Sequence, residues 1–480
     1  MGSRLVTKRF GENRTVSNWA KRVLSLAAAL TMTIAVAACG NADSRTVLTV
    51  WSWEPSMKTL IENFEHENPD IVIKQVSTAS YDKLNSAIQD GYNTPDVVQL
   101  EYYALPQYAV SGQLVDLTDR TAGYDDVFTP GTWASVQLDG DVYGVPMDSG
   151  PMAFFYNKDV FEQAGVDPTT IKTWADYYNA AKKLKQIGVY ITADSGSDAS
   201  FYESMIWLAG GRPFSTSHDG KEVSINLNKD EGTMTFTEFW QKMIDEGLVD
   251  TTLTTWSDGW KEAVGNGEIA SLFAGAWMPS LLLADVPASA GLWRVGQMPT
   301  ENGEATNAEN GGSALGILTT SRVPDAAFRF IRYVCKSQEG INTRVDGGAF
   351  PADIQTLESS DFLNRTTVTD ERGVAVNFFG GQKYNEVLAE AAKRVSTGYQ
   401  YLPFEVYART DFKSTVGKAY TWATAENKYR DALKLVENGI KPESSLPSEP
   451  GEEVTLKAGI AEWQANLKEY GANQGFTIED

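Results

Sequence analysis

Strand-like and helix-like patterns alternate over residues 47–100 of this chain. Short β-branched and apolar runs predict strands, and apolar residues three and four positions apart predict helices. In order, the predicted elements are a strand, a helix, a strand, a helix and a strand, over residues 47–51, 57–64, 71–76, 81–89 and 95–100. This alternation predicts an α/β fold with a parallel sheet that binds ligands at the carboxyl ends of its strands.

The rest of the chain continues this mixture without a long linker. Apolar residues at helical spacing predict helices over residues 236–243, 327–334, 388–395 and 458–469, and residues 315–318 are typical of a buried strand. A short Pro-, Ser- and Glu-rich stretch, residues 442–450, predicts a loop. A chain of 480 residues is long enough for two or three domains. Because no linker separates them, we expect two lobes that are joined by several short crossovers.

The N-terminal region has the pattern of an export signal. Six basic residues lie within residues 1–22, and a 16-residue apolar run, residues 23–38, ends in small residues before Cys39. This run is shorter than the roughly 20 residues that span a bilayer. The small residues and the cysteine resemble the bacterial lipobox, so we expect a signal peptide at residues 1–38, lipidation of Cys39 and a tether at residues 39–45. The alternatives are an ordinary secreted protein or an uncleaved anchor, and both also export the remainder.

Charge and composition exclude several classes of function. The net charge of −22 becomes −27 once residues 1–38, which carry +5, are removed. Such an acidic chain repels phosphate backbones, so we expect no nucleic-acid partner. The two cysteines, Cys39 and Cys335, and the two histidines, His66 and His218, are too few for a disulfide framework or a His/Cys metal cluster. We therefore expect no metal and no cofactor.

Several fragments resemble, in order and spacing, the solute-binding lipoproteins of carbohydrate ABC importers, the class that includes the maltose-binding proteins. One fragment covers residues 57–69, and the others are LTVWSW (48–53), PDVV (95–98), YGVPMD (143–148), FYNKD (155–159), TWAD (173–176), GAWMPS (275–280) and GGAFP (347–351). Each fragment alone is weak evidence, but together they extend over some 300 residues of the chain. Their common order makes coincidence a poor explanation.

The resemblance implies a two-lobed, periplasmic-binding-protein-like α/β fold of type II with a hinge of several crossovers. The crossovers are expected near residues 150–154, 297–300 and 346–350, where Gly and Pro concentrate. We expect the first lobe to comprise residues 46–152 and 300–345. The second lobe is expected to comprise residues 153–299 and 346–480.

Sugar recognition needs aromatic faces for the C–H side of a pyranose and carboxylates or amides for its hydroxyls. Trp53 and Glu54 follow the first predicted strand, and Glu101 and Tyr102 follow the third, at the edge where such a sheet binds ligands. Glu54 and Glu101 are equally compatible with a solvated surface.

The remaining site predictions come from the resemblance or from residue type. The resemblance implies that Asp148 is the polar residue before the first crossover and that Trp277 is the aromatic platform of a GxW motif. The further candidates are Tyr81, Asp96, Trp207, Trp256, Trp260, Gly312, Gly381 and Gln382. A structural role is the alternative for each, since most tryptophans pack in cores and an Asp after a proline often shapes the start of a strand.

These residues favour capture of an oligosaccharide and its delivery to the permease of an ABC importer, without catalysis. The candidate loops are rich in carboxylates and Trp but poor in paired Arg or Lys, so neutral ligands are favoured over anions. We expect a monomer that is lipid-anchored to the outer face of the bacterial cell membrane. One alternative is an exported glycoside hydrolase that uses Glu54 and Glu101, or Asp148, as its carboxylate pair. Another is a binding protein for a non-sugar solute such as a polyol or glycerol phosphate, although the lack of a basic cluster counts against a phosphate ligand.

Overall fold

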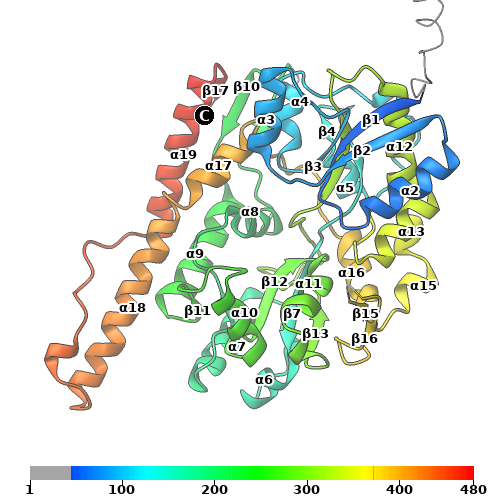
Figure 1. Cartoon of the computed structure of the whole chain (residues 1–480). Coiled ribbons are helices and arrows are strands. Elements are labelled where there is room, and N and C mark those ends of the chain that lie inside the picture. Colours follow the sequence, from blue (N-terminus) through cyan, green and yellow to red (C-terminus); the bar gives the residue numbers. More distant parts are fainter. Residues whose placement is uncertain (1–44, 218, 371, 480) are drawn as a thin grey trace, which may run out of the picture. The chain divides into compact units, whose positions relative to one another are not determined.

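The computed structural model describes residues 45–217, 219–370 and 372–479 (Figure 1). Cys39, the expected signal peptide at residues 1–38 and His218 lie outside these described residues. Val47–Asp480 form one unit, which is described here by itself. None of the helices in the described part of the chain has both the length and the apolar composition needed to cross a membrane.

The first sheet confirms the strands predicted near the N-terminus and adds two from farther along the chain. Its strands, in spatial order, are β2 (Ile71–Val76), β1 (Thr46–Trp51), β3 (Val97–Glu101), β14 (Ser313–Ile317) and β6 (Val145–Pro146). β1 and β3 pair in parallel, with Val50 opposite Val97. β14 pairs antiparallel with both β3 and β6. The sheet is therefore mixed, whereas the local alternation of strands and helices predicts a parallel one.

Amphipathic helices cover this sheet and close the first core. α2 (Met57–Glu67) buries Met57, Leu60, Ile61 and Phe64, the residues whose spacing predicts a helix. α12 (Pro324–Lys336) packs beside it, and the rings of Phe64 and Phe330 meet edge to face at 5.1 Å. The other helices of this lobe are α3 (Tyr81–Asp90), α4 (Leu105–Val110) and α5 (Pro130–Ala134). We call this sheet with its helices the first lobe.

A second sheet separates two further cores. Its strands are β12 (Ser271–Gly275), β7 (Met152–Asn157) and β13 (Trp293–Gly296), with β7 in the middle and antiparallel to both neighbours. Side chains alternate along a strand, so Phe154 and Tyr156 of β7 enter one core while Ala153 and Phe155 enter the other. This sheet and the elements around it form the second lobe.

The helices of the second lobe divide between the two faces of this sheet. On the Phe154 face pack α7 (Trp174–Gln186), α8 (Ala199–Leu208), α9 (Glu231–Asp245), α17 (Glu405–Phe412), α18 (Gly417–Glu437) and α19 (Leu456–Asn473). On the Phe155 face pack α10 (Asp258–Asn266), α11 (Met278–Asp285), α13 (Gln338–Asp346), α15 (Ser360–Leu363) and α16 (Tyr384–Lys393). In Figure 1, α18 and α19 follow one another in orange and red, and the segment between them contains the predicted loop at residues 442–450, within which Glu443–Ser445 form a 3₁₀ turn.

Short elements complete the described chain. They are β4 (Gln137–Leu138), β5 (Asp141–Val142), α6 (Lys158–Gln163), β8 (Thr192–Ala193), β9 (Phe214–Thr216), β10 (Glu222–Ile225), β11 (Val249–Asp250), α14 (Ile354–Leu357), β15 (Val368–Thr369), β16 (Ala375–Val376) and β17 (Thr477–Glu479), together with four 3₁₀ turns.

The chain passes between the lobes at segments that lie side by side. The first passage lies between Met147, in the first core, and Met152, in the second lobe. The chain returns between Ala308 and Ala314, which is C-terminal to the expected crossover at residues 297–300. Isolated β-bridges join Pro151 to Glu309 and Asp148 to Pro351, so three connecting segments lie next to one another.

Candidate functional site

A cavity of about 520 Å³ lies between the carboxyl ends of β1 and β3 in the first sheet and the second lobe. Its volume falls within the range of roughly 300–1,000 Å³ that is typical of small-molecule sites. Side chains of both lobes line it, and they include Trp53, Glu54, Gln99, Glu101, Asp148 and Ser313 from the first lobe and Asp198, Ser200, Trp256, Trp260, Trp277 and Met278 from the second. The connecting residues 310–312 lie between the two sets.

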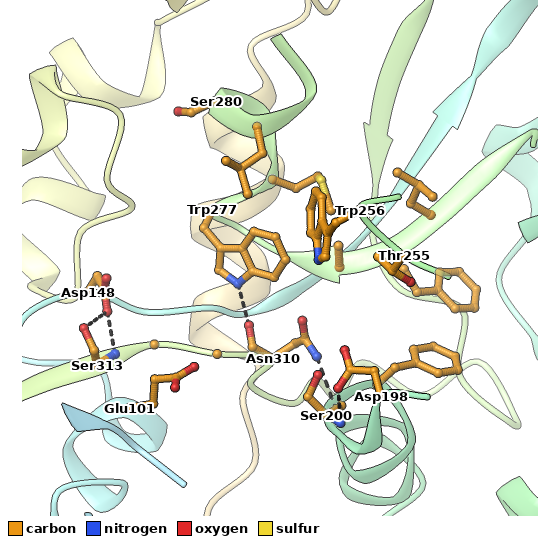
Figure 2. A pocket seen from close by; sticks show the side chains of 18 of the residues that line it. Glu101, Asp148, Asp198, Ser200, Thr255, Trp256, Trp277, Ser280, Asn310 and Ser313 are labelled. Carbon is orange, nitrogen blue, oxygen red and sulfur yellow. Dashed lines mark hydrogen bonds between the residues drawn. The ribbon is translucent and has the colours of Figure 1, made fainter. Parts of the chain in front are cut away.

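Three indole rings form the aromatic wall of the cavity, which we define as Trp256, Trp260 and Trp277. The ring of Trp256 lies 5.0 Å from that of Trp260 and 6.0 Å from that of Trp277. Trp260 is buried, whereas Trp256 remains 39% exposed and has a φ of +70°. A bulky side chain rarely adopts this backbone conformation, and such strain clusters at ligand-binding sites. Figure 2 shows Trp256 and Trp277 on the same side of the cavity.

Trp277 is fixed to the connecting segment beneath it. Its indole Nε1–H donates to the carbonyl oxygen of Asn310 at 2.6 Å (Figure 2). Gly311 and Gly312 follow with φ values of +90° and +89°. A Cβ atom at Gly312 would lie 2.5 Å from the ring of Tyr102. Only glycine therefore lets the segment pass between Trp277 and Tyr102.

A buried hydrogen-bond network holds the polar side of the cavity. Asp148 accepts from the backbone N–H of Ser313 and from its hydroxyl at 2.8 Å. Gln99 donates to the same hydroxyl at 2.9 Å, and its Oε1 accepts from the backbone N–H of Trp53 at 3.0 Å. Burial raises the pKa of Asp148 to about 6, against the lowering effect of the Ser313 hydrogen bonds, and nearby Glu54 raises it further. The network fixes Trp53 and Asp148 relative to one another.

The carboxylates of Glu101 and Glu54 are oriented by neighbouring hydroxyls. Tyr81 donates its hydroxyl to Glu101 Oε2 at 3.2 Å and accepts from the Glu101 backbone N–H at 3.1 Å. Tyr81 itself does not line the cavity. Glu54 Oε1 accepts from the hydroxyl of Ser56 at 2.6 Å and from its backbone N–H at 3.0 Å. Tyr81 thus orients Glu101, which lines the cavity.

The second lobe and the connecting segment add polar groups that sequence reasoning missed. Asp198 caps α8 by accepting from the backbone N–H of Ser200 at 2.9 Å. Asn310 donates its amide to the hydroxyl of Ser204 at 3.0 Å. Asp194 also lines the cavity, but its carboxylate is occupied by Trp240, Tyr420 and the Gly196 backbone. The signals for the missed residues were weak: a helix N-cap pattern at Asp198, and the position of Asn310 before two glycines.

Arg409 is the one cationic side chain among the described residues that line the cavity. Its guanidinium lies 2.7 Å from Glu203 and 3.7 Å from Glu405, which are both buried. It also stacks 3.7 Å from the ring centroid of Tyr103. The charge of Arg409 is therefore balanced inside the protein rather than presented to an anionic ligand.

Seven of the predicted ligand-binding residues line the cavity: Trp53, Glu54, Glu101, Asp148, Trp256, Trp277 and Gly312. Trp260, a further stacking candidate, lines it as well. Their contact with a ligand stays a prediction, because the structure establishes only that they lie together.

Three predicted residues are held in the interior or at the far end of a strand. Trp207 is 3% exposed and stacks on Tyr399 at 4.8 Å, which makes it a core residue. Asp96 precedes β3 at the end opposite Glu101, and it accepts from the backbone N–H of Thr49 at 2.8 Å. Tyr102 is buried and donates its hydroxyl to the carbonyl oxygen of Asp148 at 2.6 Å.

Gly381 and Gln382 lie outside the cavity, beside β13. The Gln382 side chain accepts from the Val295 backbone N–H at 2.9 Å and donates to its carbonyl oxygen at 2.7 Å. It therefore extends the edge of the second sheet.

Across residues 45–217, 219–370 and 372–479, no cluster of three or more His, Cys, Asp or Glu side chains is arranged to hold a metal ion.

Comparison with known proteins gives similarities of sequence and of structure. Residues 59–360 match the family described as "Bacterial extracellular solute-binding protein". The chain is 48% identical to the ABC transporter associated binding protein from B. animalis subsp. lactis Bl-04, which was solved in complex with β-1,6-galactobiose. That match covers 91% of this chain and 100% of the other, with a TM-score of 0.75.

Two more distant relatives extend the comparison. The lactose-binding protein of Rhizobium radiobacter is 29% identical over 336 residues, which cover 65% of this chain and 76% of that protein. The sugar-binding protein MalE from Xanthomonas citri is 21% identical with a TM-score of 0.65, covering 89% and 98% of the two chains. At that identity the likeness concerns the fold alone, and it confirms the predicted two-lobed architecture.

Proposed function

Because the chain belongs to the bacterial extracellular solute-binding proteins, we propose that it is the sugar-binding component of an ABC importer and that its ligand is a short β-galactoside. Family membership confirms the resemblance predicted from the sequence fragments, and it places the protein outside the cytoplasm. The β-galactoside assignment is supported by the 48% identical relative with β-1,6-galactobiose and by the lactose-binding relative, since both sugars are β-linked galactosides.

One arrangement supports this proposal most strongly: the aromatic wall faces carboxylates and amides across one cavity. Indole faces stack on the C–H side of a sugar ring, and carboxylate and amide oxygens accept from its hydroxyls. We assign stacking to Trp277 and Trp256, and hydroxyl recognition to Asp148, Asp198 and Asn310. Since the Arg409 charge is balanced by Glu203 and Glu405, the site suits a neutral ligand.

Capture and release need no covalent step in this scheme. The connecting segments lie side by side, so the two lobes can rotate about them and close over a sugar. We propose the first and second lobes as the moving bodies, divided at the passages between Met147 and Met152 and between Ala308 and Ala314, so that residues 300–308 move with the second lobe. In this proposal the bound sugar passes chemically unchanged to the permease, as expected of a solute-binding protein rather than of a glycoside hydrolase.

Titration calorimetry of the mature protein tests the proposal. The panel is β-1,6-galactobiose, lactose, galactose and maltose, and chromatography of each mixture afterwards checks that the sugar is intact. We expect micromolar or tighter binding of the β-galactosides and no cleavage. Trp277→Ala should abolish binding, whereas Trp422→Ala, which removes an indole from α18 outside the cavity, should not. A lack of binding to every sugar of the panel, or cleavage of a sugar, would overturn the proposal.

The membrane anchor is a separate proposal. We assign Cys39 as the lipidated residue of a monomeric protein that is held at the outer face of the cell membrane, because small residues precede Cys39 at the end of the predicted export signal. In cell fractionation, Cys39→Ala should move the protein from the membrane fraction to the medium. Retention of the variant in the membrane fraction would contradict the anchor.

A further inference from the structure

Glu309 joins the two central connecting segments through its side chain. Its Oε2 accepts from the backbone N–H of Gly150 at 2.6 Å, and its Oε1 accepts from the hydroxyl of Ser149 at 2.9 Å. The same Oε1 accepts from the hydroxyl of Thr132 on α5 at 3.1 Å. Glu309 itself belongs to the returning segment, so one carboxylate holds that segment, the outgoing segment and a helix of the first lobe.

The backbone around Glu309 leaves little freedom. The Asn310 N–H donates to the carbonyl oxygen of Gly150 at 2.7 Å. A Cβ atom at Gly150 would lie 2.3 Å from the carbonyl oxygen of Asn310, so only glycine permits this approach. From the second lobe, Ser204 on α8 donates to the carbonyl oxygen of Glu309 at 2.8 Å. Contacts from both lobes therefore converge on this position.

Glu309 does not line the cavity, but its neighbours do. Asp148 directly precedes the Ser149 and Gly150 donors, and Asn310 directly follows Glu309. The spacing between Asp148 and Asn310 across the cavity thus depends on the bonds that the Glu309 carboxylate makes. A change in those bonds would move two candidate sugar-binding groups relative to one another.

The carboxylate of Glu309 receives hydrogen bonds from its surroundings but has no ion-pair partner. Glu309 is 1% exposed, and none of the ion pairs found among the described residues involves it, so no ion pair balances its negative charge when it is ionised. Burial raises the pKa of Glu309 to about 7, the bonds from Ser149, Gly150 and Thr132 lower it, and Asp148 raises it. Both of its protonation states are therefore populated near neutral pH.

The other titratable groups near Glu309 do not supply a cation. Tyr102 faces it from the first lobe and Tyr401 from the second, and burial raises the pKa of both hydroxyls, so they stay neutral. Glu203, which neighbours Ser204 on α8, is paired with Arg409. Arg344 is buried beside Asp148 and donates to the carbonyl oxygens of Met147 and Val334.

We propose that ionised Glu309 is a positioning residue for sugar binding. Its hydrogen bonds join the outgoing segment, which contains Ser149 and Gly150, to its own returning segment, and thereby fix the distance between Asp148 and Asn310 across the cavity. This inference rests on the proposed sugar-binding function. Protonation turns one oxygen of the Glu309 carboxylate from a hydrogen-bond acceptor into a donor, although Gly150, Ser149 and Thr132 all donate to this carboxylate. The bonds between the two segments then weaken, and the sugar complex becomes less stable. Sugar binding then releases a proton near neutral pH, by linkage.

Calorimetric titration of the mature protein with β-1,6-galactobiose between about pH 5.5 and about pH 8.5 tests this role. We expect the wild-type affinity to fall about tenfold as the pH decreases, with its midpoint near the pKa of about 7. Glu309→Gln mimics the protonated acid, so its affinity should stay low and lack this step. A lower step from Asp148, whose pKa is about 6, should remain in the variant. The control Glu301→Gln, at an exposed position N-terminal to Glu309, should follow the wild type.

Thermal unfolding separates positioning from a merely structural role. A raised pKa means that the ionised carboxylate is unfavourable in the folded state, so its contribution to stability is lost as the pH rises through about 7. Glu309→Gln should therefore raise the melting temperature at alkaline pH while it weakens sugar binding. A variant that loses both stability and affinity would contradict the proposal.

A second variant keeps the inference testable if Glu309→Gln does not fold. Ser149→Ala removes one donor to Glu309, so the midpoint of the affinity profile should move to higher pH. A wild-type protein that binds the sugar equally at every pH would overturn the positioning role alone. A wild-type protein that binds no sugar at any pH would overturn the proposed function instead.

Discussion

Replacing Trp277 by phenylalanine should weaken β-galactoside binding by roughly twofold to 12-fold. The change replaces the indole by a smaller ring, and the lost stacking on the sugar amounts to about 0.5–1.5 kcal/mol of binding free energy, where about 1.4 kcal/mol corresponds to a tenfold change in Kd. It also removes the hydrogen bond from Nε1 to the carbonyl oxygen of Asn310 at 2.6 Å. This bond lies within the protein, so its loss should lower the free energy of unfolding by about 0.5–1.5 kcal/mol.

Calorimetric titration of Trp277→Phe with β-1,6-galactobiose measures this effect, and chemical denaturation shows whether the fold is intact. Trp422→Phe is the matched control, because its indole also donates to a backbone carbonyl, that of Gly451 at 3.1 Å, but outside the cavity. We expect the control to bind as the wild type does. If Trp277→Phe binds as tightly as the wild type does, the stacking assignment is wrong, and an unchanged free energy of unfolding would contradict the hydrogen bond to Asn310.

Three further substitutions test the placement of other residues. Trp207→Phe loses its hydrogen bond to Ser396 and part of the stacking on Tyr399. Urea denaturation should therefore show a free energy of unfolding that is lower by about 1–3 kcal/mol, while sugar affinity stays unchanged. A loss of affinity would show that Trp207 contributes to the binding site. Gly312→Ala forces a side chain into a φ of +89° and should lower both stability, by about 1–3 kcal/mol, and affinity, which denaturation and calorimetry will measure together. The pKa of Asp148 is raised to about 6 from 3.8, so the stability of the wild type falls as the pH rises through about 6. Asp148→Asn should therefore be more stable than the wild type at pH 8, by up to about 3 kcal/mol, and no more stable at pH 4; an equal difference at both pH values in urea denaturation would refute this assignment.

The elements near the N-terminus could be predicted because their signals are local. β1, α2 and β2 each follow from a run of residues within one window, and Trp53 and Glu101 follow from the rule that ligands bind at strand ends. The mixed sheet could not be predicted this way, since the antiparallel pairing of β14 with β3 joins residues more than 200 positions apart.

Sequence alone does not distinguish a stacking tryptophan from a core tryptophan. Trp207 and Trp277 have the same chemistry, but Trp207 is covered by Tyr399 and Trp277 lies against the cavity. This difference depends on tertiary packing, which the spacing of residues along the chain does not encode. Asp198 was missed for the same reason, because its local pattern indicates a helix cap and nothing more.

The aromatic wall and the connecting segments belong to one chain of hydrogen bonds. Trp277 donates to the carbonyl oxygen of Asn310, the Asn310 N–H donates to Gly150, and the Gly150 N–H donates to Glu309. A sugar that stacks on Trp277 therefore presses on a side chain that is bonded to the segment about which the lobes would turn. We therefore propose that ligand contact and lobe movement are coupled through these short bonds, because the backbone packs closely at Gly150 and Gly312 and leaves the connecting segments little room to shift independently.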